Sequence, residues 1–208
     1  MSEKNFNFII FSSINWTTHN QLHHELTNYL ISKNNKVLFV ENTGSRSLKF
    51  SDYKRVIHRI KIWFRSTLGV KAKNRNLTIF SPLFIPLPFN YFAIKINNFI
   101  ISMTINKWQE LIERKETIII TFLPTPLIYN LSLKINKSLL VYYCADEMTY
   151  FSSYKKKLVK WENKLIRKSD IVFYTSEKLG KKIKEISNNS FLIENGVDFN
   201  KFNSKKRN

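Results

Sequence analysis

The sequence predicts an α/β fold, in which a mostly parallel, Rossmann-like sheet carries helices on both faces. Two observations lead to this class. Short, dense apolar runs recur along the chain, as expected for strands that are buried on both faces. Between them lie segments whose apolar residues return at helical spacing, and no internal repeat or low-complexity linker interrupts the alternation.

Seven segments have the composition of strands, and the third is the weakest. Each is short and dominated by apolar residues, many of them β-branched or aromatic, which suit a buried pleated surface. In chain order they are Phe6–Ser12, Lys36–Glu41, Leu77–Phe80, Thr117–Phe122, Ser138–Tyr143, Asp170–Thr175 and Ser190–Glu194.

Four helices are expected between these strands. Thr18 and Gln21 form a capping box that predicts the start of the first helix, and Ser176 is a typical cap for the last. Three of the helices are defined by apolar positions at helical spacing: Leu22, Leu26, Tyr29 and Leu30; Tyr154, Leu158, Trp161 and Leu165; and Leu179, Ile183 and Ile186. The remaining helix is expected from Asn90 to about Ile112.

The chain is strongly basic. Its 208 residues include 34 Lys and Arg against 15 Asp and Glu, which gives a formal net charge of +19. A general richness in Lys, Asn and Ile explains part of this excess but not its clustering. We therefore expect an anionic partner, which is a nucleic acid, an anionic membrane surface or a phosphorylated ligand.

Compartment and membrane topology can also be predicted. The single cysteine, Cys144, excludes an intramolecular disulfide and fits a reducing compartment. Residues 1–7 lack the order of a signal peptide, so we expect a cytoplasmic protein. The longest apolar stretch, Leu83 to Ile105, is interrupted by Pro, Lys and Asn. It therefore predicts a docked or interfacial helix after Asn90 and not a transmembrane span.

Several familiar motifs are absent. The turn after the first strand has no glycine, and there is no P-loop, which argues against a self-contained nucleotide enzyme. His19 and His23 are four residues apart, but no Glu of an H-E-x-x-H motif separates them, so no metal site is expected. Cys144 follows a buried strand and is expected to be a packed thiol.

Asp146 and Glu147 are adjacent carboxylates at the end of the predicted strand 138–143. Ligands of open parallel sheets bind outside the carboxyl ends of the strands. One carboxylate can act as a general base on a sugar hydroxyl while its neighbour holds a cation or raises the first group's pKa. The alternative is that the pair caps the next helix or balances Lys155–Lys157. His19, near the first helix, either contacts an anionic ligand or is simply exposed.

A basic run between Lys54 and Arg75 has an amphipathic pattern. Its cations alternate with apolar residues that share a helical face, which suits the interface of an anionic bilayer. The alternative is a solvated basic face whose apolar side packs on the domain. The residues expected to contact a membrane are Arg55, Arg59, Trp63 and Phe64.

Five segments resemble the N-terminal half of family-four (group 1) glycosyltransferases of GT-B architecture. They are FSSINWTTHNQLHHELTNYL, VLFVENTGSR, VYYCADE, SDIVFYTSEKL and ENGVDFNKF, and the resemblance covers nearly the whole chain. The first two are similar to a narrower set of bacterial enzymes that build surface polysaccharides such as lipopolysaccharide and capsule. The last two follow an order that recurs across the superfamily.

The resemblance implies an acceptor-binding domain over residues 1–194 and the start of an interdomain linker over residues 195–208. In such enzymes the N-terminal domain binds the acceptor, often a lipid-linked glycan, and a C-terminal domain binds the nucleotide sugar. We expect this chain to hold no donor domain, and therefore expect the nucleotide sugar at that missing C-terminal domain and no cofactor in the domain itself. The resemblance further implies a metal-independent protein, peripheral on the inner face of the cytoplasmic membrane.

The resemblance also suggests site residues. Asn15, Trp16, Glu41 and Arg46 match loops that border the cleft, and with His19 and Glu147 they form the expected acceptor-binding set. Asp146 matches an acidic position after the fifth strand and is the expected catalytic carboxylate.

Two other functions are compatible with the sequence. A basic nucleic-acid-binding module would use the charge and the scattered aromatics, although no nucleic-acid-binding motif is present. A non-catalytic membrane-docking subunit would pair with a separate donor-domain chain. Whether the chain is an acceptor-binding domain or the docking subunit of a split transferase, we expect catalysis only within a full-length or two-chain enzyme.

Overall fold

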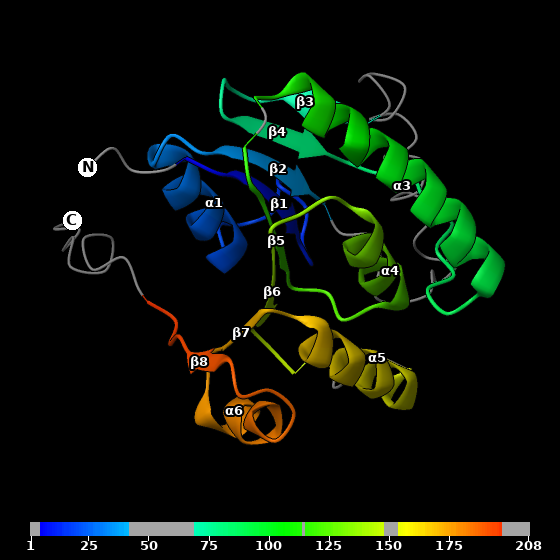
Figure 1. Ribbon diagram of the computed structural model, residues 1–208, viewed down its shortest axis with the longest axis vertical. Helices are drawn as coiled ribbons and strands as arrows, with labels where there is room; N and C mark the ends of the chain where they lie inside the picture. The colour runs from blue at the N-terminus through cyan, green and yellow to red at the C-terminus, as the bar shows by residue number, and fades with distance from the viewer. Residues whose placement is uncertain (1–4, 42–68, 114, 148–153, 197–208) are drawn as a thin grey trace, which may run out of the picture.

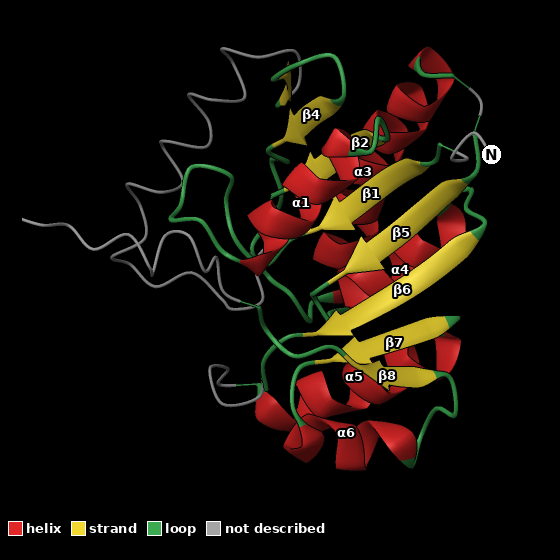
Figure 2. Ribbon diagram, turned by 90° about the vertical axis from the view of Figure 1, so that its left-hand side faces the viewer, coloured by secondary structure: helices red, strands yellow, loops and turns green. Residues whose placement is uncertain are grey.

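A computed structural model describes residues 5–41, 69–113, 115–147 and 154–196. The chain forms an eight-stranded sheet in the order β3-β4-β2-β1-β5-β6-β7-β8 (Figures 1 and 2). The strands are β1 (Asn7–Phe11), β2 (Lys36–Val40), β3 (Val70–Ala72), β4 (Leu77–Phe80), β5 (Thr117–Thr121), β6 (Leu139–Cys144), β7 (Ile171–Tyr174) and β8 (Ser190–Leu192). The described helices are α1 (Leu22–Ser32), α3 (Tyr91–Leu111), α4 (Pro126–Lys134), α5 (Lys155–Lys168) and α6 (Glu177–Lys184).

The sheet is parallel except at one edge. β1 lies between β2 and β5 and is parallel to both, whereas β3 pairs with β4 in antiparallel fashion. From β1 the chain runs outward through β2 to β4, and then returns to build β5, β6, β7 and β8 on the other side. The strand order therefore reverses between β1 and β5, which makes this the topological switch point where open α/β sheets bind ligands. The predicted Rossmann-like fold class is confirmed.

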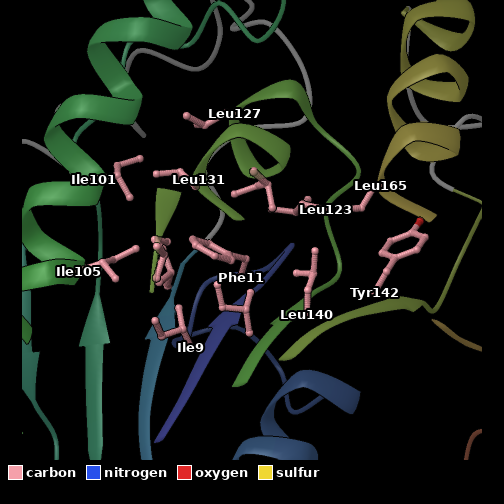
Figure 3. Close-up of a cluster of buried hydrophobic side chains, with 14 of the residues drawn as sticks. Ile9, Phe11, Ile101, Ile105, Leu123, Leu127, Leu131, Leu140, Tyr142 and Leu165 are labelled. Atoms are coloured by element: carbon pink, nitrogen blue, oxygen red, sulfur yellow. The ribbon is translucent and has the colours of Figure 1, made fainter. Parts of the chain in front are cut away.

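The two faces of the sheet carry different helices. Side chains alternate along each strand, so Ile9 and Phe11 of β1 face one layer while Phe8 and Ile10 face the other. The first layer contains α3, α4 and α5, joined by Ile183 of α6, and Figure 1 shows the first three together on one side of the sheet. The second layer contains α1. Figure 3 shows how the first core closes, with Ile101, Ile105, Leu127, Leu131 and Leu165 pointing at Ile9, Phe11 and Leu140.

Most predicted helix ends are found. α3 begins after Asn90, whose side chain accepts a hydrogen bond from the Ala93 N–H at 3.0 Å. Ser176 caps α6 by accepting from the Leu179 N–H at 3.5 Å. Satisfying these terminal donors is what the caps were expected to do.

The predicted capping box of Thr18 and Gln21 is wrong, because the observed box, Gln21 and His24, lies three residues later in the chain. The Thr18 hydroxyl donates to the Asn15 carbonyl at 2.7 Å and so closes a turn in the preceding loop. α1 begins after Gln21, whose N–H donates to Nδ1 of His24 at 3.1 Å. The capping pair is therefore Gln21 and His24, because a histidine nitrogen accepts at the position usually held by Glu or Gln.

Two elements were not predicted. β3 has only three residues, two of them exposed. α4 is mostly buried, so it lacks the alternation of apolar and polar sides that identifies a surface helix. The sequence nevertheless contains a signal for the start of α4, since Thr125 caps the helix and Pro126 occupies its first turn. Among the described helices, none combines the length and the apolarity needed to cross a bilayer.

Candidate acceptor site at the carboxyl edge of the sheet

The described part of the expected site lies along one edge of the sheet. Glu41 follows β2, Asn15 and Trp16 follow β1, and Asp146 follows β6. Parallel strands end at the same edge, and β2, β1, β5 and β6 are consecutive neighbours. With a spacing of about 4.8 Å between strands, β1 and β6 are roughly 10 Å apart across the switch point.

A serine–histidine pair occupies the switch point itself. Ser13, two residues after β1, lies 3.0 Å from Nε2 of His23 through its Oγ. The His23 ring stands against Phe122, which directly follows β5, with ring centres 3.8 Å apart. The pair therefore joins the ends of β1 and β5 through the first turn of α1. In the sequence His23 stands out only as a candidate metal ligand, and its contact with Ser13 was not predicted.

His23 is held neutral. Its side chain is buried, with 6% of its surface exposed, and its Nδ1 has no hydrogen-bond partner among the described residues. Burial, with a smaller contribution from the neighbouring His24, lowers the pKa of His23 from 6.5 to about 4. At neutral pH the imidazole is uncharged, and its contact with Ser13 fixes the position of that hydroxyl at the edge of the sheet.

His24 and Trp16 have structural roles in the same loop. Nδ1 of His24 accepts from Gln21, so Nε2 carries the proton that it donates to the Trp16 carbonyl at 3.1 Å. The Trp16 ring packs edge-on against His24 and Phe39, with ring centres 4.9 Å away in both cases. Lys73 Nζ lies 4.9 Å from the centre of the same ring. The indole is thus part of the α1-side core while its backbone borders the edge.

Glu41 joins three loops. It is buried at the end of β2, where one carboxylate oxygen accepts from the Trp16 N–H at 2.8 Å and the other from the Ser81 hydroxyl at 2.5 Å. A buried carboxylate needs such donors, because an unsatisfied charge away from water is costly. In this arrangement the carboxylate positions the loop after β1 by hydrogen bonds to the protein.

The two acidic residues after β6 differ in their surroundings. Asp146 is exposed, and no hydrogen bond to its carboxylate is found among the described residues. Glu147 is half-buried, and one of its carboxylate oxygens lies 3.8 Å from Lys178 Nζ on α6. Asp146 is therefore the more available proton acceptor at this edge. His19 is exposed in the loop before α1.

A row of aromatic rings crosses the sheet on the α1 side. It begins at the His23–Phe122 contact and continues through Tyr143, Phe173 and Phe191, with successive ring centres 5.1, 5.7 and 6.4 Å apart. A mostly apolar groove of about 320 Å³ opens over this row, between α1 and strands β5 to β7. Its lining residues are Leu22, Glu25, Leu26, Tyr29, Ile120, Tyr143, Phe173 and Ile193.

A second polar cluster lies on the opposite face of β6. The Tyr142 hydroxyl donates to Glu162 of α5 at 2.9 Å, and Lys182 of α6 meets the other carboxylate oxygen at 2.5 Å. Cys144 lies beside them, and burial and the Glu162 charge raise the pKa of its thiol to about 12. The expected packed thiol is what the structure contains. The described residues hold no group of three potential metal ligands.

Some predictions fall outside the described residues. These are Arg46 of the acceptor-binding set and all four expected membrane contacts, Arg55, Arg59, Trp63 and Phe64. Most of the expected linker, residues 197–208, also lies outside them.

No profile of a known protein family matches the chain, and no curated protein sequence matches it. Two solved structures of similar fold are both sucrose-phosphate synthase from Thermosynechococcus elongatus. One has a TM-score of 0.56 and 12% identity over 94% of this chain and 92% of that chain. The other has a TM-score of 0.57 and 11% identity over 94% of this chain and 49% of that chain. This chain therefore spans about half the length of the second.

The chain has the fold of a GT-B half-domain. At these identities the likeness concerns the fold, and it agrees with the fold that the sequence resemblance implied. In this half-domain the edge that carries Ser13, Glu41 and Asp146 is the edge where ligands of open α/β sheets bind.

Proposed function

We propose that this chain is the acceptor-binding half of a glycosyltransferase. Its acceptor is a glycan, in our proposal a lipid-linked one, and the sugar comes from a nucleotide sugar bound by a second domain or a separate chain. The product belongs to a cell-surface polysaccharide, and the protein works at the inner face of the cytoplasmic membrane. The observation that carries the proposal is the match of the whole described fold to a GT-B half-domain.

The groove over the aromatic row is the proposed seat of the acceptor. Tyr143 and Phe173 line it together with aliphatic side chains. Flat aromatic faces suit the apolar faces of sugar rings, and the aliphatic lining suits a lipid. The groove lies beside α1, the helix that also carries His23 of the Ser13–His23 pair.

Asp146 is the proposed general base. As the acceptor hydroxyl oxygen forms its bond to the anomeric carbon, the Asp146 carboxylate takes the hydroxyl proton, and the nucleoside diphosphate leaves with the electrons of the broken bond. Its exposure at the end of β6 leaves it accessible to a substrate in the cleft. Ser13 and the loops held by Glu41 position the acceptor.

The binding test uses this chain alone and a short-chain polyprenyl diphosphate linked to N-acetylglucosamine, followed by calorimetry. We expect binding that Phe173→Ala weakens at least about tenfold, since the loss of one aromatic contact is worth about 1.4 kcal/mol. Leu133→Ala, at an exposed position of α4, is the matched control and leaves binding unchanged. Tight binding of UDP-glucose by the chain alone, with no binding of the glycolipid, would contradict the assignment of the acceptor half.

The catalytic test requires the chain together with a donor half. Asp146→Asn should lower the transfer rate by about 100-fold or more while leaving glycolipid binding intact, because general-base catalysis typically contributes that much. A variant that transfers sugar within twofold of the parent rate would remove Asp146 from the mechanism. Binding of a single-stranded oligonucleotide with a steep salt dependence, without glycolipid binding, would instead indicate the nucleic-acid module.

A further inference from the structure

The outward side of α3 is apolar. Phe92, Ile96, Phe99 and Met103 follow one another at helical spacing, and 71%, 63% and 57% of the surfaces of Phe92, Phe99 and Met103 are exposed. The inward side holds Ile101, Ile105 and Trp108 in the core, so the exposed residues lie on the side away from the sheet. Tyr91 and Ile100 of the same helix are also exposed, as are Ile85 and Leu87 in the segment before it.

This surface, which we call the α3 stripe, is unusual for its concentration. Eight of the exposed large hydrophobic residues among the described ones fall within residues 85–103. Single exposed apolar side chains are ordinary, but a contiguous patch marks a surface that another body covers.

The neighbouring surface is basic. α5 lies in the same layer as α3, with α4 between them (Figure 1). All seven of its Lys and Arg residues are exposed, while its only acidic residue, Glu162, is buried against Lys182. These cations are Lys155, Lys156, Lys157, Lys160, Lys164, Arg167 and Lys168.

Contacts of Phe89 link the start of α3 to the start of α5. The Phe89 ring, just before α3, packs against Tyr154 at the start of α5 with ring centres 4.9 Å apart. Lys157 Nζ lies 5.7 Å from the centre of the Phe89 ring. Exposed Lys95 and Lys107 add positive charge on α3, whose only acidic residue is Glu110, near its C-terminus. An apolar ridge and a set of cations thus share this layer, and Glu110 is the only exposed acidic residue of α3 and α5.

We propose that the α3 stripe inserts into the interface of an anionic lipid bilayer, with the α5 cations held against its headgroups. Apolar side chains flanked by Lys and Arg are the composition that binds such interfaces, because the cations add electrostatic attraction to the anionic headgroups. A second copy of the chain fits less well, because two surfaces from chains of charge +19 repel each other. A nucleic acid would bind the cations through its phosphates, but it would leave the aliphatic side chains of Ile96, Ile100 and Met103 without a partner.

This assignment rests on the proposed membrane location but not on sugar transfer, because the test uses vesicles without any glycan. The test is co-sedimentation with vesicles of phosphatidylcholine alone and with 30% phosphatidylglycerol by composition. We expect binding to the anionic vesicles that salt weakens, and a loss of at least about tenfold in the Phe92→Asp/Phe99→Asp variant. Asn28→Asp is the control: this residue is exposed, but it lies on α1, on the other side of the sheet.

A second measurement does not depend on the charged variant folding. Met103→Cys can be labelled with a polarity-sensitive dye, since the native Cys144 is buried. Its emission should shift to the blue on adding anionic vesicles, whereas a label at Asn28→Cys on α1 should not respond. Equal binding by the parent and the double variant, or equal response of both labels, would overturn the proposal. So would a dimer in solution that the double variant converts to monomer without any vesicle binding.

Discussion

The hydroxyl of Tyr142 donates a 2.9 Å hydrogen bond to the buried carboxylate of Glu162. Tyr142 is fully buried on β6, and Lys182 of α6 closes the other side of the carboxylate. The carboxylate of Glu162 thus connects β6, α5 and α6, three elements that are separated in sequence, inside the first core. Figure 3 shows Tyr142 directed toward α5 beside Leu165.

Tyr142→Phe should lower the free energy of unfolding by about 1–2 kcal/mol. The ring still fills its space, but one oxygen of a buried carboxylate loses its donor, and an unsatisfied buried acceptor costs about this much. Urea unfolding followed by far-ultraviolet circular dichroism measures the change. Tyr29→Phe, on the exposed side of α1, should change stability by less than about 0.3 kcal/mol. Equal effects of the two variants would mean that the buried hydrogen bond contributes nothing.

Lys182→Met should destabilise the protein by about 1–3 kcal/mol. Methionine keeps the length of the side chain but removes the cation that faces Glu162, and a buried carboxylate without its partner is strongly unfavourable. The partial exposure of Lys182 keeps the expected cost below that of a fully buried pair. The control is Lys181→Met, at the exposed neighbouring position of the same helix. A similar loss in both variants would point to helix α6 in general and not to the ion pair.

The sequence contained a readable sign of this cluster. Glu162 lies four residues after Leu158 and three before Leu165, which places a carboxylate on the buried side of a predicted helix. Such a residue requires a partner, but the partner comes from β6 and α6, and periodicity along one helix does not identify it. The same limit applies to Ser13 and His23, because their contact depends on the path of the loop between β1 and α1.

The fold was more predictable than the site. Strands buried on both faces have long apolar runs, and these runs predicted the strands of a mostly parallel sheet, but not their order in space. In a parallel sheet the loops after the strands gather at the carboxyl edge, which is where Trp16, Glu41 and Asp146 lie. The α3 stripe was only partly foreseen. The sequence predicted an interfacial helix after Asn90, but which side chains remain uncovered follows from the packing of α4 and α5.

Gly180→Ala should destabilise the protein by about 1–3 kcal/mol. A Cβ at this position of α6 would lie 2.9 Å from Cζ of Tyr174, whose ring is fully buried. The overlap should exceed the gain of about 1 kcal/mol that alanine brings to a helix. Thermal and urea unfolding give the comparison. Gly196→Ala is the matched control, because a Cβ there meets nothing within 4 Å. A more stable Gly180→Ala variant would show that β7 and α6 move apart easily.

His23 should make the stability of the protein depend on pH between about 6.5 and 4. Its pKa is about 6.5 in the unfolded chain and about 4 in the fold. Between these values the unfolded state binds more protons, so the free energy of unfolding falls as the pH is lowered. The full contribution, present above pH 6.5, is about 3 kcal/mol. In His23→Gln the decline from pH 7.5 to 4.5 should therefore be smaller by about 2–3 kcal/mol.

The slope with pH separates this effect from a simple loss of packing. His23→Gln also removes the ring that stands against Phe122, which lowers stability at every pH by a similar amount. Only the loss of the titrating group changes the difference between pH 7.5 and pH 4.5. His19→Gln is the control, since His19 is exposed and its replacement should leave that difference unchanged. Parallel curves for the parent and His23→Gln would show that His23 is protonated in the fold as readily as in the unfolded chain, and that the imidazole beside Ser13 is not held neutral.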